Sequence, residues 1–189
     1  MKIIFLDHDG VICLSNNWGG RFKKQSDWGG KTPSMGMQDI PLQYRFDNFD
    51  VKSIKVLNEI LEETGAEIVV SSDWTRWATL EEMGEYYELQ GIIKKPIDFT
   101  GSITHGKYDE FPWQRQVMLE QVRSLEILEY LENNPNITNW VAIDDLDMSI
   151  RTNVDGEYSW GLENFVLTPN EREGIKQSGI GEKIKKFLK

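Results

Sequence analysis

Acidic and hydroxyl side chains follow three short apolar runs of this sequence. The runs are Lys2–Leu6, Glu67–Val70 and Trp140–Ile143, and the polar clusters after them are Asp7-His8-Asp9, Ser71-Ser72-Asp73 and Asp144-Asp145. Each run has the length and composition of a strand buried on both faces. If the strands are parallel, the clusters meet at one edge of the sheet, because ligand sites form at the carboxyl ends of parallel strands.

Such clusters contain the groups that phosphate-ester hydrolysis through a covalent intermediate requires. A carboxylate attacks phosphorus, and a second carboxylic group protonates the leaving oxygen and later activates water. Mg²⁺, held by carboxylates, offsets the repulsion between nucleophile and phosphate. A hydroxyl group and a cation hold the phosphoryl oxygens.

The positions in the sequence suggest one residue for each role. Asp7 ends the first run and is the candidate nucleophile, and Asp9 is the candidate acid and base. Gly10 permits the tight turn that would direct Asp9 back towards the same phosphate. The other candidates are Ser71, Ser72 and Arg123 for binding phosphate, and Asp144 and Asp145 for binding the metal.

Each cluster alone has an ordinary structural explanation. Asp-x-Asp-Gly is a common turn, Ser71, Ser72 or Asp73 could cap a helix, and Asp144-Asp145 could be a solvated turn. An EF-hand loop is excluded, because Gly10 directly follows the second aspartate and no glutamate stands at the twelfth position. The occurrence of all three clusters, each after an apolar run, favours the catalytic interpretation.

The rest of the chain predicts helices between the strands. We expect helices over Val51–Thr64, capped by Asp50 and ended by Gly65, and over Trp74–Leu89, Pro112–Asn133 and Glu171–Leu188. Ser72 or Asp73 would cap the second helix, the third could be in two pieces, and Gly179 or Gly181 could interrupt the last. Further strands are expected at Phe165–Thr168 and at Ile92-Ile93. This alternation predicts a single α/β domain with a parallel sheet.

Composition limits the function classes. The chain has 189 residues, a net charge of −10 and a pI near 4.8, which argues against broad binding of nucleic acid through its phosphates. The single cysteine, Cys13, lies among apolar residues and is expected to pack in the core. No apolar run has the length of a membrane span or of a signal peptide. We therefore expect a cytoplasmic protein.

The sequence resembles the haloacid dehalogenase (HAD) superfamily of phosphohydrolases. The resemblance lies in Ile3–Val11 (IIFLDHDGV), Ile68–Ser71 (IVVS) and Val141–Asp145 (VAIDD). Leu57–Trp74, preceded by Phe46–Asp50, is similar to the HAD branch found in "Swiss army knife" RNA-repair proteins. The resemblance implies a Rossmann-like fold and one Mg²⁺. It makes Asp7 both nucleophile and metal ligand, and lets Asp9 add a metal contact through its backbone carbonyl.

The basic residue of the third HAD motif has three candidates. Arg123 precedes Asp144 by 21 residues, a spacing like that of the branch, but Ser124-Leu125 stands where a small and an acidic residue are expected. Lys107 and Arg115 are the alternatives.

Residues 12–48 form an insertion between the first two motifs, at the place where this superfamily carries caps. They are too few for a large helical cap, so we predict a small flap and an open site. Trp18, Arg21, Lys23 and Trp28 are its candidate substrate contacts, because aromatic rings and cations together suit a phosphorylated base. The tryptophans could instead pack the flap onto the domain.

The sequence therefore predicts a Mg²⁺-dependent phosphomonoesterase that works through an aspartyl-phosphate. Polynucleotide ends, nucleotides and small phosphorylated metabolites are the candidate substrates, and no kinase P-loop is present. The alternatives are a HAD-fold binding or scaffold protein without turnover and phosphoryl transfer to an acceptor other than water. The sequence leaves the oligomeric state open.

Overall fold

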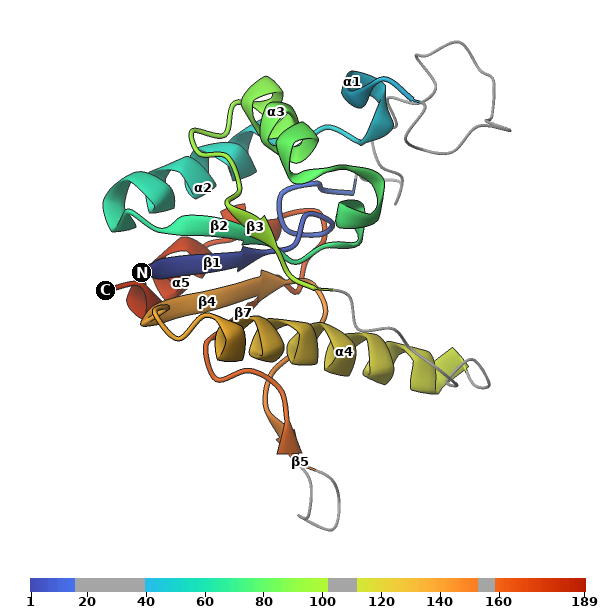
Figure 1. Cartoon of the computed structure of the whole chain (residues 1–189), viewed down its shortest axis with the longest axis vertical. Coiled ribbons are helices and arrows are strands. Elements are labelled where there is room, and N and C mark those ends of the chain that lie inside the picture. Colours follow the sequence, from blue (N-terminus) through green and yellow to red (C-terminus); the bar gives the residue numbers. More distant parts are fainter. Residues whose placement is uncertain (16–39, 102–111, 153–158) are drawn as a thin grey trace.

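A parallel five-stranded sheet forms the centre of the computed structural model (Figure 1), which describes residues 1–15, 40–101, 112–152 and 159–189. Its order is β3-β2-β1-β4-β7. The strands are β1 (Lys2–Leu6), β2 (Glu67–Val70), β3 (Asp98–Phe99), β4 (Asn139–Asp144) and β7 (Phe165–Leu167). Helices cover both faces, so the predicted α/β, Rossmann-like fold with a central parallel sheet is confirmed.

The register of the three central strands brings their carboxyl ends to the same level. Leu6 of β1 is paired with Val70 of β2 and with Ile143 of β4. The ladder continues past β1, because the Asp7 N–H donates to the Ile143 carbonyl at 3.1 Å. The polar residue after each strand therefore emerges at one edge of the sheet.

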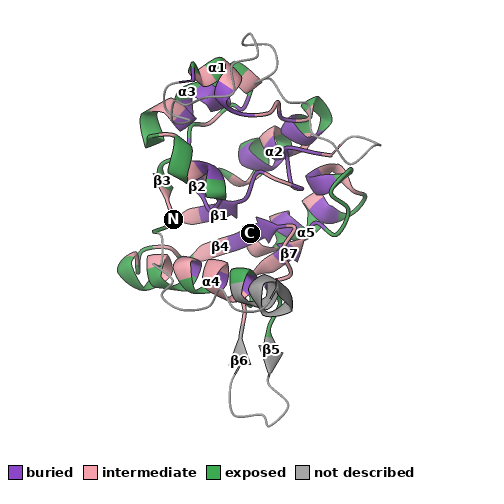
Figure 2. Cartoon of the chain, turned by 90° about the vertical axis from the view of Figure 1, so that its right-hand side faces the viewer, coloured by how far each residue is buried: buried purple, intermediate pink, exposed green. Residues whose placement is uncertain are grey.

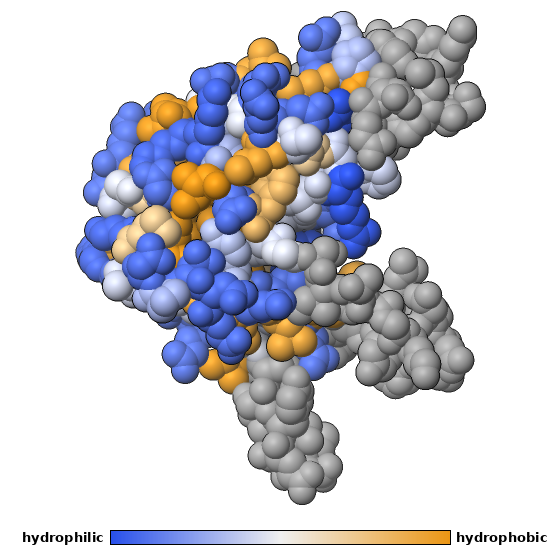
Figure 3. Space-filling view, viewed as in Figure 1, coloured by the Kyte–Doolittle hydropathy of each residue, from blue (hydrophilic) through white to orange (hydrophobic). Residues whose placement is uncertain are grey.

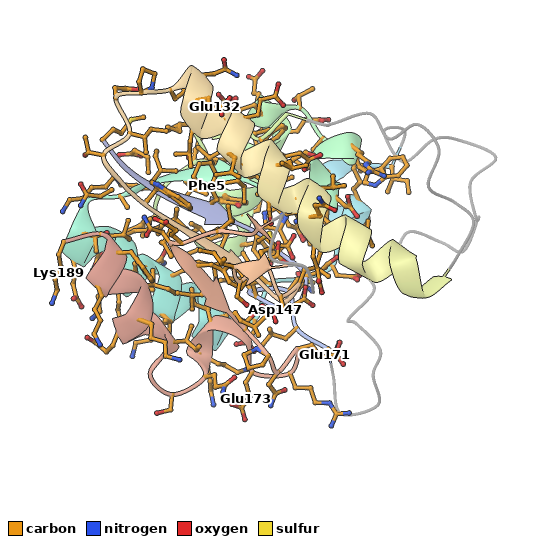
Figure 4. All side chains as sticks on the ribbon, turned by 90° about the horizontal axis from the view of Figure 1, so that it is seen from below. Phe5, Glu132, Asp147, Glu171, Glu173 and Lys189 are labelled. Carbon is orange, nitrogen blue, oxygen red and sulfur yellow. The ribbon has the colours of Figure 1, made fainter. Side chains whose placement is uncertain are left out.

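The two faces of the sheet bury separate apolar clusters, because side chains alternate along a strand. Ile4 and Leu6 face α2 (Val51–Thr64), α3 (Leu80–Gln90) and α5 (Ile180–Phe187), whereas Ile3 and Phe5 face α4 (Pro112–Asn133). Buried residues are concentrated on the strands and on the inward helix faces (Figure 2). Seen from the side of α4, Phe5 lies beneath this helix (Figure 4), with its ring 5.6 Å from that of Tyr130.

Both predicted ends of α2 are confirmed. The Asp50 carboxylate accepts a hydrogen bond from the Ser53 N–H at 2.9 Å and so caps the first turn. Gly65 ends the helix in the left-handed conformation, with φ +69°, where a side chain would be strained. Lys176 adds an ion pair to Asp50 at 3.1 Å, which ties this helix start to the segment after β7.

The prediction of one helix over Trp74–Leu89, capped by Ser72 or Asp73, was wrong in its form. A short 3₁₀ helix, η3 (Asp73–Trp77), comes first, and the extended backbone of Ala78 separates it from α3. Thr79 begins α3 with a capping box, because its side chain accepts from the Glu82 N–H and the Glu82 carboxylate accepts from the Thr79 N–H. The capping box therefore starts a new helix at Thr79, although the sequence pattern is helical from Trp74 onward.

The strand expected at Ile92-Ile93 is also absent. These residues follow the left-handed Gly91 that ends α3, and the Ile92 N–H returns to the Tyr87 carbonyl. The edge strand β3 forms six residues later, where Asp98 and Phe99 pair with Val69 and Val70. Ile92 and Ile93 therefore belong to the turn that ends α3. Ile92 is buried and Ile93 is half-exposed.

The remaining elements refine the other expectations. The Pro112–Asn133 segment is one helix, α4. The Glu171–Leu188 segment contains a short 3₁₀ helix, η4 (Gly174–Lys176), and then α5, which starts after Gly179 and includes Gly181. Besides β3, the sequence did not predict α1 (Leu42–Arg45) or the antiparallel pair of β5 (Arg151–Thr152) and β6 (Ser159–Trp160).

The described ends of the 12–48 insertion belong to the core. Ile12, Cys13 and Phe46 are buried in the cluster between the sheet and α2, which agrees with the packing role expected for Cys13. Most of the predicted flap, including Trp18, Arg21, Lys23 and Trp28, lies outside the described residues.

Among the described helices, none combines the length and apolarity that crossing a bilayer demands. On the face seen in Figure 3, hydrophilic residues predominate and hydrophobic residues form smaller patches among them.

Replacing the cap of α2 should give a pH-dependent loss of stability. We expect Asp50→Ala to lower the free energy of unfolding at pH 7 by about 1 kcal/mol. Partial burial raises the pKa of Asp50, but the Ser53 N–H and Lys176 outweigh it and hold this pKa below its ordinary 3.8. The contribution of Asp50 is therefore complete above about pH 4 and is lost as the pH falls through the folded-state pKa.

Urea denaturation of wild type and Asp50→Ala at pH 7 and pH 3 measures this loss. The difference between the two proteins should shrink at pH 3. Lys183→Ala, on the surface of α5, is the control and should change stability little at either pH. A difference of equal size at both pH values would contradict the role of the carboxylate.

Candidate active site

Three carboxylates converge at the carboxyl edge of the sheet. Asp7 and Asp144 are buried and Asp145 is partly exposed, and one oxygen from each lies within 4.8 Å of the others. β1 and β4 are adjacent and end in register, so their terminal residues cannot be far apart. The convergence expected from the sequence is confirmed for these residues.

Arg123 reaches this cluster from α4, the helix that packs on the Ile3 and Phe5 face of the sheet. Its Nη1 donates to Asp7 Oδ1 at 3.1 Å, to Asp144 Oδ2 at 3.2 Å and to the Ser71 carbonyl. The structure therefore places Arg123, one of the three basic candidates, beside Asp7. The side chain of Arg115 and the whole of Lys107 lie outside the described residues.

The close carboxylates perturb one another. Burial raises the pKa of Asp7 to about 6; Arg123 opposes the rise, whereas Asp9 and Asp145 add to it. Burial and the neighbouring Asp7 hold the pKa of Asp144 well above its usual range. Although burial acts in the opposite direction, Asp7 and Asp144 raise the pKa of Arg123, so the guanidinium stays charged. Among the described residues, one guanidinium thus lies against a cluster of three carboxylates.

The turn after β1 is compact. The His8 carbonyl accepts from the N–H groups of Val11, Ile12 and Cys13, at 2.7 to 3.2 Å. Gly10 has φ +69°, and a Cβ built on it would overlap the Asp145 carboxylate. Glycine is therefore required at this position for two reasons, the backbone conformation and the close approach of Asp145.

Asp9 lies on this turn and contacts an aromatic residue of η3. The Trp74 Nε1–H donates to Asp9 Oδ2 at 3.3 Å. Trp74 is almost fully buried and belongs to the main core cluster. Sequence reasoning treated it only as the start of a helix, so this contact was missed.

His8 points into the core. It is fully buried, and its Nε2 lies 2.7 Å from the Tyr87 hydroxyl. Its ring centroid is 4.7 Å from that of Trp74. Burial lowers the pKa of His8 to about 3, and Arg123 adds to this effect, so the imidazole is neutral at physiological pH.

The two serines after β2 lie beside the carboxylates. Both are buried, and the Ser72 hydroxyl contributes to lowering the pKa of Asp7, against the larger effect of burial. The Ser71 hydroxyl has no hydrogen-bond partner among the described residues. A buried hydroxyl without a protein partner is uncommon and suits a ligand oxygen.

Thr168 is a residue of the site that sequence reasoning did not identify. It is fully buried directly after β7, and its hydroxyl donates to the carbonyls of Gly10 and Asp144, each at 3.2 Å. It therefore links the turn after β1 to the end of β4. In the sequence, the only indication of this role was the position of Thr168 at the end of the predicted fourth strand.

Replacing Gly10 should show how closely this turn and Asp145 fit together. We expect Gly10→Ala to destabilise the fold more than Gly65→Ala. Both glycines have φ +69°, so the backbone strain of about 1–2 kcal/mol is shared. Only Gly10 has a close neighbour, since nothing lies within 4 Å of a Cβ at Gly65. Urea denaturation of both variants measures the difference, and equal losses would contradict the contact with Asp145.

One family model matches the chain. The model, described as the HAD domain in Swiss Army Knife RNA repair proteins, matches residues 3–179. Comparisons with curated proteins and with solved structures gave no significant match. The matched region includes every strand of the sheet and the carboxylate cluster. The chain therefore belongs to the family of HAD domains of Swiss Army Knife RNA repair proteins, which supports a HAD-type phosphohydrolase in general terms.

Proposed function

We propose that this protein is a Mg²⁺-dependent phosphomonoesterase that forms an aspartyl-phosphate on Asp7. The observation that carries the proposal is the position of Asp7 at the end of β1, beside the Arg123 guanidinium and the acids Asp144 and Asp145. Candidates for the nucleophile, the phosphate-binding cation and the metal ligands therefore lie in one cluster.

The acids suit a hard divalent cation. Asp7, Asp144 and Asp145 offer oxygen atoms within 4.8 Å of one another, and oxygen is the ligand that Mg²⁺ prefers. Among the described residues, Arg123 is the basic group hydrogen-bonded to Asp7 and Asp144, and the charge of three ionised carboxylates exceeds that of one guanidinium. When bound, Mg²⁺ would neutralise this charge and that of the phosphate. Asp7, Asp144, Asp145 and the backbone carbonyl of Asp9 are the proposed ligands.

In the first half of the proposed reaction, an oxygen of Asp7 attacks phosphorus. The bond from phosphorus to the ester oxygen breaks, and Asp9 donates a proton to the departing alcohol. The Ser71 hydroxyl, which is buried without a described partner, would donate to a phosphoryl oxygen. Ser72 and the Arg123 guanidinium would hold the others.

In the second half, water attacks the aspartyl-phosphate. Asp9, now ionised, accepts a proton from this water, and the phosphorus–oxygen bond to Asp7 breaks. The products are inorganic phosphate and the restored Asp7 carboxylate, with Asp9 protonated again. The turn after β1 carries both Asp7 and Asp9, so one short segment would serve both steps.

The family points to phosphorylated nucleic-acid ends or nucleotides as the substrate class. Its description names RNA-repair proteins, and the predicted flap carries Trp18, Arg21, Lys23 and Trp28, which suit a phosphorylated base. The net charge of −10 argues for local contacts at a terminal phosphate and against binding along a polymer. Rates on a 3′- or 5′-phosphorylated oligonucleotide, a nucleoside monophosphate and a sugar phosphate would distinguish these substrates.

Phosphate release from an aryl phosphate should require both Asp7 and a divalent cation. We expect Asp7→Asn to lower the rate at least about 1,000-fold, because an amide cannot form the acyl-phosphate, and EDTA to stop the wild type. Asp147→Asn is the matched control: Asp147 follows β4, contacts Ser149 and has no proposed catalytic role. Full activity of Asp7→Asn, or of wild type in EDTA, would contradict the mechanism.

Removing the Arg123 guanidinium should impair catalysis. We expect Arg123→Ala to lower kcat/KM by about 100-fold or more, since preorganised charge at a phosphoryl group is commonly worth this much. Arg123→Lys should recover part of the loss, because it restores the charge without the planar fork. Arg76→Ala, in the exposed part of η3, is the control. Unchanged phosphate release by a folded Arg123→Ala protein would exclude Arg123 from the site.

A further inference from the structure

We propose that Trp74 is a positioning residue that holds the carboxyl group of Asp9 in its catalytic orientation; this rests on the proposed role of Asp9 as acid and base. The two residues are 65 positions apart, and their contact is formed by the turn after β1 and η3. The indole N–H of Trp74 donates to Asp9 Oδ2 at 3.3 Å.

The Trp74 ring is itself held firmly. It stacks on Phe46 with a centroid distance of 4.6 Å and an interplanar angle of 5°, and on Phe49 at 5.4 Å and 18°. His8 packs against it at 4.7 Å and is fixed in turn by the Tyr87 hydroxyl. With rings on several sides and only 8% of its surface exposed, the indole presents its N–H in one direction.

An indole N–H suits this task chemically. It is a donor only and does not titrate, so it can bond to Asp9 without removing the proton that Asp9 must transfer. A bond to one carboxyl oxygen restricts rotation of the group in both of its protonation states. Asp9 acts first as acid and then as base, so the same orientation would serve both halves of the reaction.

The competing explanation is purely structural: Asp9 could do no more than satisfy a buried indole N–H, which would be costly without a partner. The two explanations differ in their effect on the leaving group. A misplaced acid slows the departure of a basic alkoxide or phenoxide most, whereas a good leaving group needs little protonation. A general loss of structure slows both equally.

The first experiment compares Trp74→Phe with wild type on phenyl phosphate and on 4-nitrophenyl phosphate, two esters of similar shape. We expect kcat/KM to fall about 10-fold or more for phenyl phosphate but about 3-fold or less for the nitro ester, within the range of general acid catalysis. Tyr86→Phe is the matched control, because it removes the hydrogen bonds of a buried hydroxyl to the Phe46 and Asp47 carbonyls from the same aromatic cluster. It should change both esters alike.

A double-mutant cycle tests whether the effect passes through Asp9. In the Asp9→Asn background, Trp74→Phe should change kcat/KM for phenyl phosphate by less than about 2-fold, because the acid it positions is gone. A full additive loss in the double variant, or equal losses on both esters in the single variant, would overturn the proposal.

A measurement without turnover separates this proposal from the proposed function. In ¹H–¹⁵N spectra, Asp9→Asn should shift the Trp74 indole N–H signal more than those of the other six tryptophans among the seven in the chain. This measurement needs no Trp74 variant, so it can be made even if Trp74→Phe does not fold. If wild type cleaves neither ester, the proposed function fails, but the indole signal still tests the contact between Trp74 and Asp9. An indole signal that does not shift overturns the inference about Trp74.

Discussion

The rest of the site depends on the burial of Asp7 and Asp144 side by side. They end adjacent parallel strands in register, and both are almost fully buried. Burying two like charges together is costly unless a cation compensates them. Arg123 supplies one such charge with hydrogen bonds to both, at 3.1 and 3.2 Å. α4 must therefore cross the sheet where this arginine can reach the strand ends.

The same arrangement bears on the proposed phosphate monoester substrate. Among the described residues, Arg123 is the cation that contacts Asp7 and Asp144, and a phosphate would add more negative charge. In the proposed mechanism, a metal ion held by the carboxylate oxygens would offset that charge. Metal binding and substrate binding would then be coupled by charge. An arginine without the acids would hold phosphate but offer no nucleophile.

Much of the fold followed from local pattern, and the exceptions have physical causes. β1, α2 and β2 have the predicted bounds, because β1 and β2 are continuous apolar runs that end in polar residues, whereas α2 has helical periodicity between Asp50 and Gly65. The break before α3 was missed although Thr79 and Glu82 form a readable capping box. The strand ends located Asp7, Ser71 and Asp144, since parallel strands share an edge. Arg123 and Thr168 reach the site only through the tertiary fold. Sequence spacing therefore made Arg123 a candidate and gave no indication of Thr168.

The turn after β1 links the chemistry directly to the core. Asp7 contacts Arg123 at the sheet edge, whereas the next residue, His8, is buried in the aromatic cluster and lies 2.7 Å from the Tyr87 hydroxyl. That cluster contains Trp74, whose indole returns to Asp9. Packing of the rings therefore sets the position of a carboxyl group at the sheet edge. In this chain, a change in the core can alter the site without touching any residue that contacts phosphate.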